Sequence, residues 1–164
     1  MAAARELFLE RGFDEVTVAE VAEAADVAVS TVFAHFPGGK EALVLGDAAE
    51  REAALVAAVR DRPGTILDAL HDFLATRGPF RSKPDAVARL VVTTPALRAY
   101  ARSLWTQCET ALAEVITAET NDLSARLLAR YVLEIPDLAG VEADPAAALT
   151  AAFTHLRLGW PDLP

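Results

Sequence analysis

The stretch LFLERGFDEVTVAEVAEAADVAVSTVFAHFPGGKEAL, residues 7–43, decides the fold that we expect for this chain. It contains short apolar patterns of helical period, and a turn signal follows each of them. The first pattern begins earlier and covers residues 2–11, before Gly12, which suits the left-handed position after a helix. Three short helices with a tight turn between the second and the third form a helix-turn-helix unit.

The second and third helices of this unit have their own local signals. Thr17 and Glu20 match a capping box, in which each side chain accepts a hydrogen bond from the other residue's backbone N–H. Asp26 stands at the tight turn, and aspartate tolerates left-handed backbone better than most residues. The third helix is expected to stop at residues 37–39, and its apolar stripe consists of Val29, Val32, Phe33 and Phe36.

The rest of the chain also predicts helices, because alanine, leucine and valine dominate and strand-like runs are few. Their expected ranges are 40–62 as one long helix, a helix capped by Thr65, one with Pro84 in its first position, 95–119, 122–133 with an interruption at Pro136, and 145–158 after Asp144. We therefore expect an all-α chain with a helix-turn-helix domain at residues 1–45 and a larger helical domain at 46–164.

Charge and cysteine content restrict the class of protein. The formal charge of −9 argues against a general nucleic-acid binder, because attraction to phosphates needs clustered Lys and Arg. The single cysteine, Cys108, excludes an intramolecular disulfide framework and favours a reducing compartment. No uncharged apolar run approaches the roughly 20 residues of a membrane span, and residues 1–15 do not read as a signal peptide. We expect a cytoplasmic protein with no membrane partner.

An enzyme is the main rival class, and the sequence offers little for it. The chain has no nucleophile elbow and no glycine-rich phosphate loop. One cysteine and three scattered histidines give no metal-ligand spacing. Asp68 and Asp72 lie four residues apart on one helical face, but with His71 beside them they read as a solvated edge. We expect no catalysis, no metal and no cofactor.

Residues 3–45 resemble the TetR family of bacterial transcriptional regulators. The marks that carry the resemblance are a first helix ending in glycine and an aromatic residue, a Thr-capped second helix, a third helix ending in aromatic-x-His-Phe, and a Lys-Glu pair that opens the fourth. Residues 94–116 also resemble the ligand domain of one branch of that family. The resemblance implies a repressor that binds operator DNA as a homodimer and is released by a small molecule.

Carried over residue by residue, the family's phosphate contacts fall on Thr17, Phe33, His35 and Lys40. Base edges would be read from the exposed side of the third helix by Val29, Ser30, Thr31 and Ala34, since hydroxyl groups pair with several bases and apolar groups touch the thymine methyl. Three residues depart from the family pattern, namely Asp26 for the turn glycine, Ala28 for a capping serine and Ala34 for an arginine. Phe33 replaces a tyrosine, so any contact there is apolar; its alternative role is core packing.

The negative charge of the N-terminal region allows two interpretations of its function. Residues 1–46 hold three basic and eight acidic side chains, a formal charge of −5. One interpretation is that basic residues ahead of helix one complete the DNA contact, as N-terminal arms do in other small binders. The abrupt loop at residues 118–122 likewise suggests missing residues. The alternative function is a helical protein-interaction module that no longer binds DNA.

The second domain supplies candidates for the effector and the dimer. Residues that suit an apolar ligand pocket with a few polar groups are His71, Phe73, Tyr100, Leu104, Trp105 and Cys108, although each also suits an ordinary core. Two apolar stripes suit a four-helix dimer interface or packing within the monomer: Leu123, Leu127, Leu128 and Tyr131, and Leu149, Phe153 and Leu156. The predicted helix 40–62 would carry the coupling between effector and DNA sites.

Overall fold

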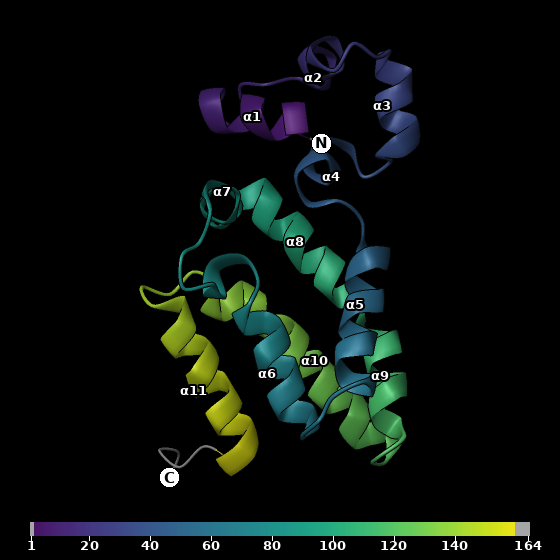
Figure 1. Ribbon diagram of the computed structural model, residues 1–164, viewed down its shortest axis with the longest axis vertical. Helices are drawn as coiled ribbons and strands as arrows, with labels where there is room; N and C mark the ends of the chain where they lie inside the picture. Colours follow the sequence, from purple (N-terminus) through teal and green to yellow (C-terminus); the bar gives the residue numbers. More distant parts are fainter. Residues whose placement is uncertain (1, 160–164) are drawn as a thin grey trace. The chain divides into compact units, whose positions relative to one another are not determined.

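The computed structural model describes residues 2–159, and every regular element among them is helical, as predicted (Figure 1). The chain forms two compact units. The first comprises the chain up to Asp47 together with Asp85–Ala101, and the second comprises Ala48–Pro84 and the chain from Arg102 onward. The sequence did not indicate that residues 85–101 group with the helix-turn-helix.

The first unit contains α1 (Ala2–Arg11), α2 (Val18–Ala24), α3 (Val29–His35), α4 (Gly39–Leu45), α7 (Ala86–Thr93) and the first part of α8 (Pro95–Gln107). Its core joins Phe8 of α1, Val21 of α2 and Val32 of α3, and Leu97 of α8 belongs to the same buried cluster. Arg5 donates two hydrogen bonds to the carbonyl of Val44, which ties α1 to the end of α4. The three-helix unit is therefore packed against α4, which follows it, and against α8 from a distant part of the sequence.

The caps and tight turns of this unit lie where the sequence predicts them. Thr17 and Glu20 form the complete capping box at the start of α2. Gly12 has a φ of 91° after α1, and Asp26 has a φ of 52° at the tight turn. Left-handed backbone is rare outside glycine, and aspartate is among the residues that adopt it most readily. The turn between α2 and α3 therefore forms without glycine.

The predicted helix 40–62 is wrong as a single element. It is two helices, α4 and α5 (Ala48–Arg60), and Gly46 ends the first of them with a φ of 73° and a ψ of −154°. The backbone N–H of Gly46 closes the last turn on the carbonyl of Ala42. A glycine inside an apolar pattern does not indicate whether the helix continues through it. Here the helix ends at Gly46.

Three further expectations about helix boundaries are corrected. Asp85, not Ser82 or Pro84, begins α7, because its side chain accepts from the N–H of Ala88. The predicted helix 95–119 is divided at Cys108 into α8 and α9 (Glu109–Thr117). Pro136 does not interrupt its helix, since α10 runs from Asp122 to Ala139.

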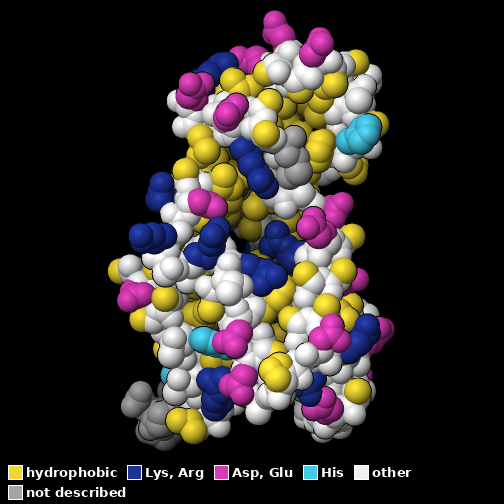
Figure 2. Space-filling view, viewed as in Figure 1, with side chains coloured by type: hydrophobic (Ala, Val, Ile, Leu, Met, Phe, Trp, Pro, Cys, Tyr) yellow, Lys and Arg dark blue, Asp and Glu magenta, His cyan; other side chains and the backbone are white. Residues whose placement is uncertain are grey.

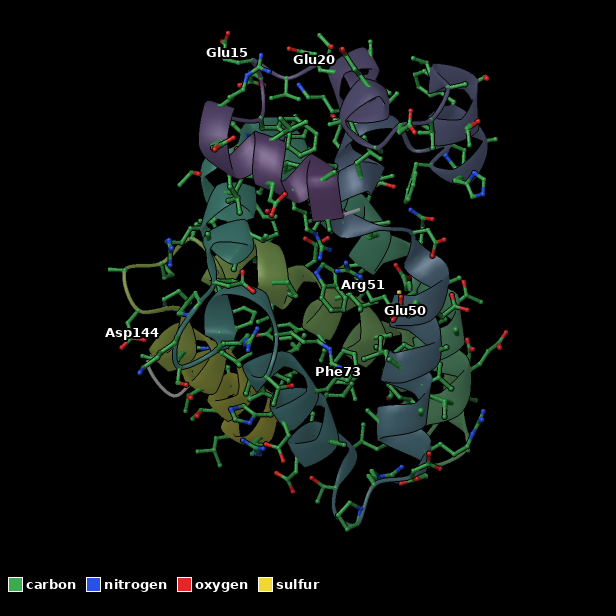
Figure 3. All side chains as sticks on the ribbon, turned by 45° about the horizontal axis from the view of Figure 1, so that its top comes forward. Glu15, Glu20, Glu50, Arg51, Phe73 and Asp144 are labelled. Carbon is green, nitrogen blue, oxygen red and sulfur yellow. The ribbon has the colours of Figure 1, made fainter. Side chains whose placement is uncertain are left out.

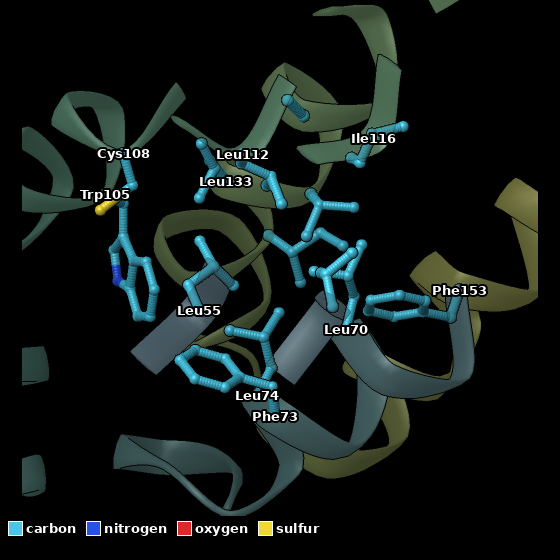
Figure 4. Packing of buried hydrophobic residues seen from close by; sticks show 14 of the residues in the cluster. Leu55, Leu70, Phe73, Leu74, Trp105, Cys108, Leu112, Ile116, Leu133 and Phe153 are labelled. Carbon is cyan, nitrogen blue, oxygen red and sulfur yellow. The ribbon is translucent and has the colours of Figure 1, made fainter. Parts of the chain in front are cut away.

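The second unit packs α5, α6 (Ile66–Ala75), α9, α10 and α11 (Pro145–Leu158) around one core, with a 3₁₀ turn at Gly78–Phe80. Figure 4 shows Leu55, Leu70, Phe73, Leu112, Leu133 and Phe153 converging from these helices. Thr65 and Asp144 cap α6 and α11 as predicted. A core of this size gives the second unit a stable framework of its own.

Candidate nucleic-acid interface

Helix α3 presents almost its whole surface to solvent. Val32 alone among its seven residues is buried, and Phe36 after its last turn is half-buried. The fractional exposure is 39% for Val29 and 50% for Phe33, although an aromatic at that spacing usually packs inside. The alternative role of Phe33 in the core is therefore wrong. A helix held to its unit by one buried side chain offers the rest for contact with a partner.

The outer face of α3 is small and uncharged. Residues four apart lie on one side of a helix, so Ser30 and Ala34 share the face opposite the buried Val32. Thr31 and Phe33 flank that face, and all four are exposed. The hydroxyls of Ser30 and Thr31 have no hydrogen-bond partner within residues 2–159, because both residues lie in the first turn and no earlier helical carbonyl is in reach.

His35 uses one ring nitrogen inside its own helix. Its Nδ1 lies 2.9 Å from the carbonyl oxygen of Thr31. A carbonyl only accepts, so the proton of the neutral ring resides on Nδ1 and Nε2 is an acceptor. In this geometry Nε2 donates a hydrogen bond only when the ring carries both protons, and the phosphate contact of His35 stays a prediction.

Lys40 is engaged within the first unit. Its ammonium lies 4.4 Å from the ring centroid of Phe13 and donates to the carbonyl of Asp14 at 3.4 Å. Phe13 in turn packs against Phe8, with 5.1 Å between ring centroids. The side chain is half-buried. Lys40 therefore stabilises the unit's own aromatic pair through a cation–π contact, and a phosphate contact would come in addition to it.

Thr17, the expected phosphate contact at the start of α2, already faces a carboxylate. Its backbone N–H donates to Glu20 Oε2 at 2.8 Å, and its hydroxyl donates to the same oxygen. Arg11 donates to the other oxygen of Glu20 at 2.7 Å. The N–H of Thr17 and then the Arg11 guanidinium lower the pKa of Glu20 from 4.5 to about 2. A phosphate at Thr17 would meet a fully ionised neighbour.

Replacement of Glu20 by glutamine is expected to lower the thermal midpoint of the first unit at pH 7. The folded-state pKa lies below the unfolded value, so this contribution to stability is present above about pH 4.5 and is lost as the pH falls toward 2. The side chain is solvent-screened, which keeps the effect small. Thermal unfolding of Glu20→Gln and wild type at pH 7 and pH 2.5 tests this. Glu23→Gln, which removes an exposed carboxylate of the same helix, is the control.

The control should leave the midpoint unchanged at both pH values. An equal loss in Glu20→Gln at pH 7 and pH 2.5 would contradict the assignment, because protonation of the wild-type carboxyl should remove the difference.

The acidic side chains of this unit cluster at one end in the view of Figure 2. Figure 2 shows magenta carboxylates over the end formed by α1 and α2, and mostly yellow and white atoms around α3. Glu15 and Glu20 lie near the start of α2 (Figure 3). Helix α3 itself carries no acidic side chain, and the exposed Glu23 and Asp26 stand shortly before it in the chain.

The expected effector residues do not form one group. Tyr100 belongs to the first unit, where its hydroxyl donates to the carbonyl of Gly46 at 3.1 Å. His71 is half-buried in the second unit and meets the ring of Phe153 edge-on at 5.3 Å. The other four, which are buried, are Phe73, Leu104, Trp105 and Cys108.

Two arginines cover the aromatic pair of the second unit. Phe73 and Trp105 meet edge to face at 6.5 Å, and the guanidinium of Arg51 lies 4.4 Å from the Trp105 ring centroid. Arg77 lies 3.4 Å from the Phe73 ring centroid, and Figure 3 labels Arg51 and Phe73. Burial raises the pKa of the nearby Cys108 thiol, which donates to the carbonyl of Leu104. Cys108 is thus an apolar core residue at neutral pH.

The expected dimer residues divide into two sets. Leu149 and Phe153 of α11 are fully buried within the second unit, so they are not available to a partner, which corrects that part of the prediction. Leu128, Tyr131 and Leu156 are half-buried against the same core. Leu123 and Leu127 of α10 have exposed fractions of 63% and 61%. Among the expected dimer residues, the exposed ones therefore lie on α10.

Sequence reasoning missed some features of the first unit. The exposure of Val27 beside α3, the contact of Arg5 with Val44 and the bond from Tyr100 to Gly46 all depend on tertiary packing, and no local pattern signals them. Gly38 lies against the Tyr100 hydroxyl, so a side chain there would collide with it. Within residues 2–159, no helix has the length and hydropathy to cross a membrane, and no His, Cys, Asp or Glu cluster is placed to hold a metal ion.

Comparison with known proteins shows what this chain is similar to. Residues 1–46 match the family described as bacterial regulatory proteins, tetR family. The chain is 32% identical over 145 residues to the HTH-type transcriptional regulator TcmR of Streptomyces glaucescens, covering 80% of this chain and 64% of that protein's length. Its fold is similar to the crystal structure of a TetR-family transcriptional regulator from Pectobacterium atrosepticum, with a TM-score of 0.55, 17% identity, and coverage of 96% of this chain and 88% of that one. The N-terminal domain, residues 1–46, is therefore that of the tetR family of bacterial regulatory proteins.

Proposed function

We propose that this chain is a sequence-specific DNA-binding transcriptional regulator that reads its operator by placing α3 in the major groove. The observation that carries the proposal is the exposure of every α3 residue except Val32, on a helix that follows a helix-turn-helix bend at Asp26. A helix presented in this way fits the width of the major groove of B-DNA. The relatives' names, which describe transcriptional regulators, support it.

Repression and release by a small molecule are the finer parts of this proposal. They rest on the family that residues 1–46 match, and the buried aromatic pair of the second unit is a candidate place for an effector. An effector that weakens DNA binding by some factor must itself bind the DNA complex more weakly by the same factor. We propose that a homodimer acts on the operator in the bacterial cytoplasm, with two α3 helices in successive major grooves about 34 Å apart.

Placing a carboxylate on the outer face of α3 is expected to abolish specific DNA binding. Purified protein first selects duplexes from a randomised library, and binding to the selected duplex is compared with a scrambled one. Wild type should prefer the selected duplex by about 10³-fold or more. Ala34→Glu should lose that preference, because the new charge faces phosphates and base edges. Ala57→Glu is the control, since Ala57 is also an exposed helical alanine but lies in the second unit.

The rival hypothesis, a helical interaction module that no longer binds DNA, gives a different result. Its support is the charge of −5 in residues 1–46. It expects wild type to bind selected and scrambled duplexes equally weakly at low salt, with no difference between the two alanine variants. That outcome would refute the proposed function.

A further inference from the structure

The recognition helix lacks the side chains that usually read guanine and adenine. From Val21 to Gly39 the chain contains no Arg, Lys, Asn or Gln. In the major groove, Arg and Lys read guanine, and Asn and Gln read adenine, through paired hydrogen bonds. In α3 the one ionisable side chain is His35, whose Nδ1 is taken by the Thr31 carbonyl. Bidentate hydrogen bonding therefore cannot supply the specificity of this helix.

What α3 does present is a set of methyl and aromatic groups. Val29 and Phe33 lie four residues apart and are both exposed, and the methyl of Ala34 is exposed beside them. Val27, just before the helix, is also exposed. Exposed apolar side chains cost hydration free energy unless a partner covers them. In the major groove, the apolar feature of a base edge is the C5-methyl group of thymine.

The hydroxyls of Ser30 and Thr31 complete this face. Neither has a partner among the described residues, and a hydroxyl both donates and accepts, so it pairs with several bases. Ser30 and Ala34 are also small, which allows the helix backbone to approach the base edges closely. The face therefore combines close apolar contact with hydrogen bonds of low base selectivity.

We infer that α3 reads its operator chiefly through thymine methyl groups, with Val29, Phe33 and Ala34 as the contacting side chains. Hydroxyls of Ser30 and Thr31 set the register on the duplex. This inference rests on the proposed function, because it assumes that α3 enters the major groove. The inference predicts operator half-sites that are rich in T·A pairs at the positions that α3 contacts.

Replacing thymine by uracil in the selected duplex removes only the methyl group and tests the inference directly. For each contacted thymine, wild-type affinity should fall about fourfold, the contribution of one buried methyl-sized group. Substitution at thymines outside the footprint should leave affinity unchanged. A fluorescence-anisotropy titration of wild type with the two forms of the duplex gives the ratio.

A variant identifies the protein side of the contact. Phe33→Ala should bind the thymine duplex more weakly than wild type, and should become insensitive to uracil at one or more positions where wild type is sensitive. Leu158→Ala, which also truncates an exposed apolar side chain but in the second unit, should keep the wild-type pattern. Circular dichroism of each variant checks that its helices are intact.

The outcomes separate the two proposals. Specific binding that is indifferent to uracil at every position overturns thymine-methyl reading and leaves the regulator function standing. Uracil sensitivity that is unchanged in Phe33→Ala, Val29→Ala and Ala34→Gly alike overturns the assignment to these side chains. Failure to select any preferred duplex refutes the proposed function itself.

Discussion

Replacing Phe153 by alanine is expected to lower the free energy of unfolding of the second unit by about 3–5 kcal/mol. The Phe153 side chain has no exposed surface and belongs to the core that joins α5, α6, α9, α10 and α11. Its ring also meets the half-buried His71 edge-on at 5.3 Å. Alanine would leave a cavity that rigid helices on several sides cannot close. Urea unfolding followed by circular dichroism measures the change.

The same experiment distinguishes core packing from the dimer role expected from sequence. A core residue shifts the unfolding midpoint equally at every protein concentration. A residue at a dimer interface shifts it in a way that depends on concentration, because association contributes to stability by mass action. Leu158→Ala is the control on the same helix, since Leu158 is 75% exposed. If the loss of stability in Phe153→Ala depends on protein concentration, Phe153 lies at the dimer interface instead.

Replacing Leu127 by aspartate is expected to dissociate the proposed homodimer. Leu127 and Leu123 are exposed leucines one turn apart on α10, a helix whose opposite side is buried. In a two-fold interface each leucine occurs twice, so the substitution removes two apolar contacts of about 1.5 kcal/mol or more each. The dissociation constant should therefore rise at least about a hundredfold. Affinity for a two-half-site operator should fall with it.

Sedimentation at micromolar concentration measures this directly. Wild type should sediment with the mass of two chains and Leu127→Asp with the mass of one. Leu9→Asp places the same charge at an exposed leucine of α1 and should remain dimeric. A wild type of single-chain mass would refute the dimer, and a dimeric Leu127→Asp would move the interface away from this part of α10.

Predictions that succeeded rest on residues close together in sequence. The capping box of Thr17 and Glu20, the left-handed Gly12 and the cap at Asp144 all depend on hydrogen bonds within one turn of chain. Their geometry requires no contact with a distant part of the chain. Val29, Ser30, Thr31 and Ala34 were expected on the exposed side of α3, and all four are exposed.

Predictions that failed concern competition between elements far apart in sequence. The ring of Phe33 has the spacing of a core residue, yet the core of the first unit is already filled by side chains from α1, α2, α4 and α8. The sequence also did not indicate that the ammonium of Lys40 lies over Phe13, 27 residues earlier in the chain, and its phosphate contact stays a prediction. Periodicity states which residues share a face but not which neighbour that face meets.

The sequence by itself determined the helical class, the helix-turn-helix and the family of the N-terminal domain, because local capping, turn chemistry and an ordered motif define them. Tertiary structure alone decided that Leu149 and Phe153 pack in the core while Leu123 and Leu127 stay open, and that Tyr100 joins the first unit. Amphipathic helices of similar pattern are equally suited to bury their apolar face in the monomer or against a partner. The choice follows from how all the helices together fill the available volume, and no single segment contains that information.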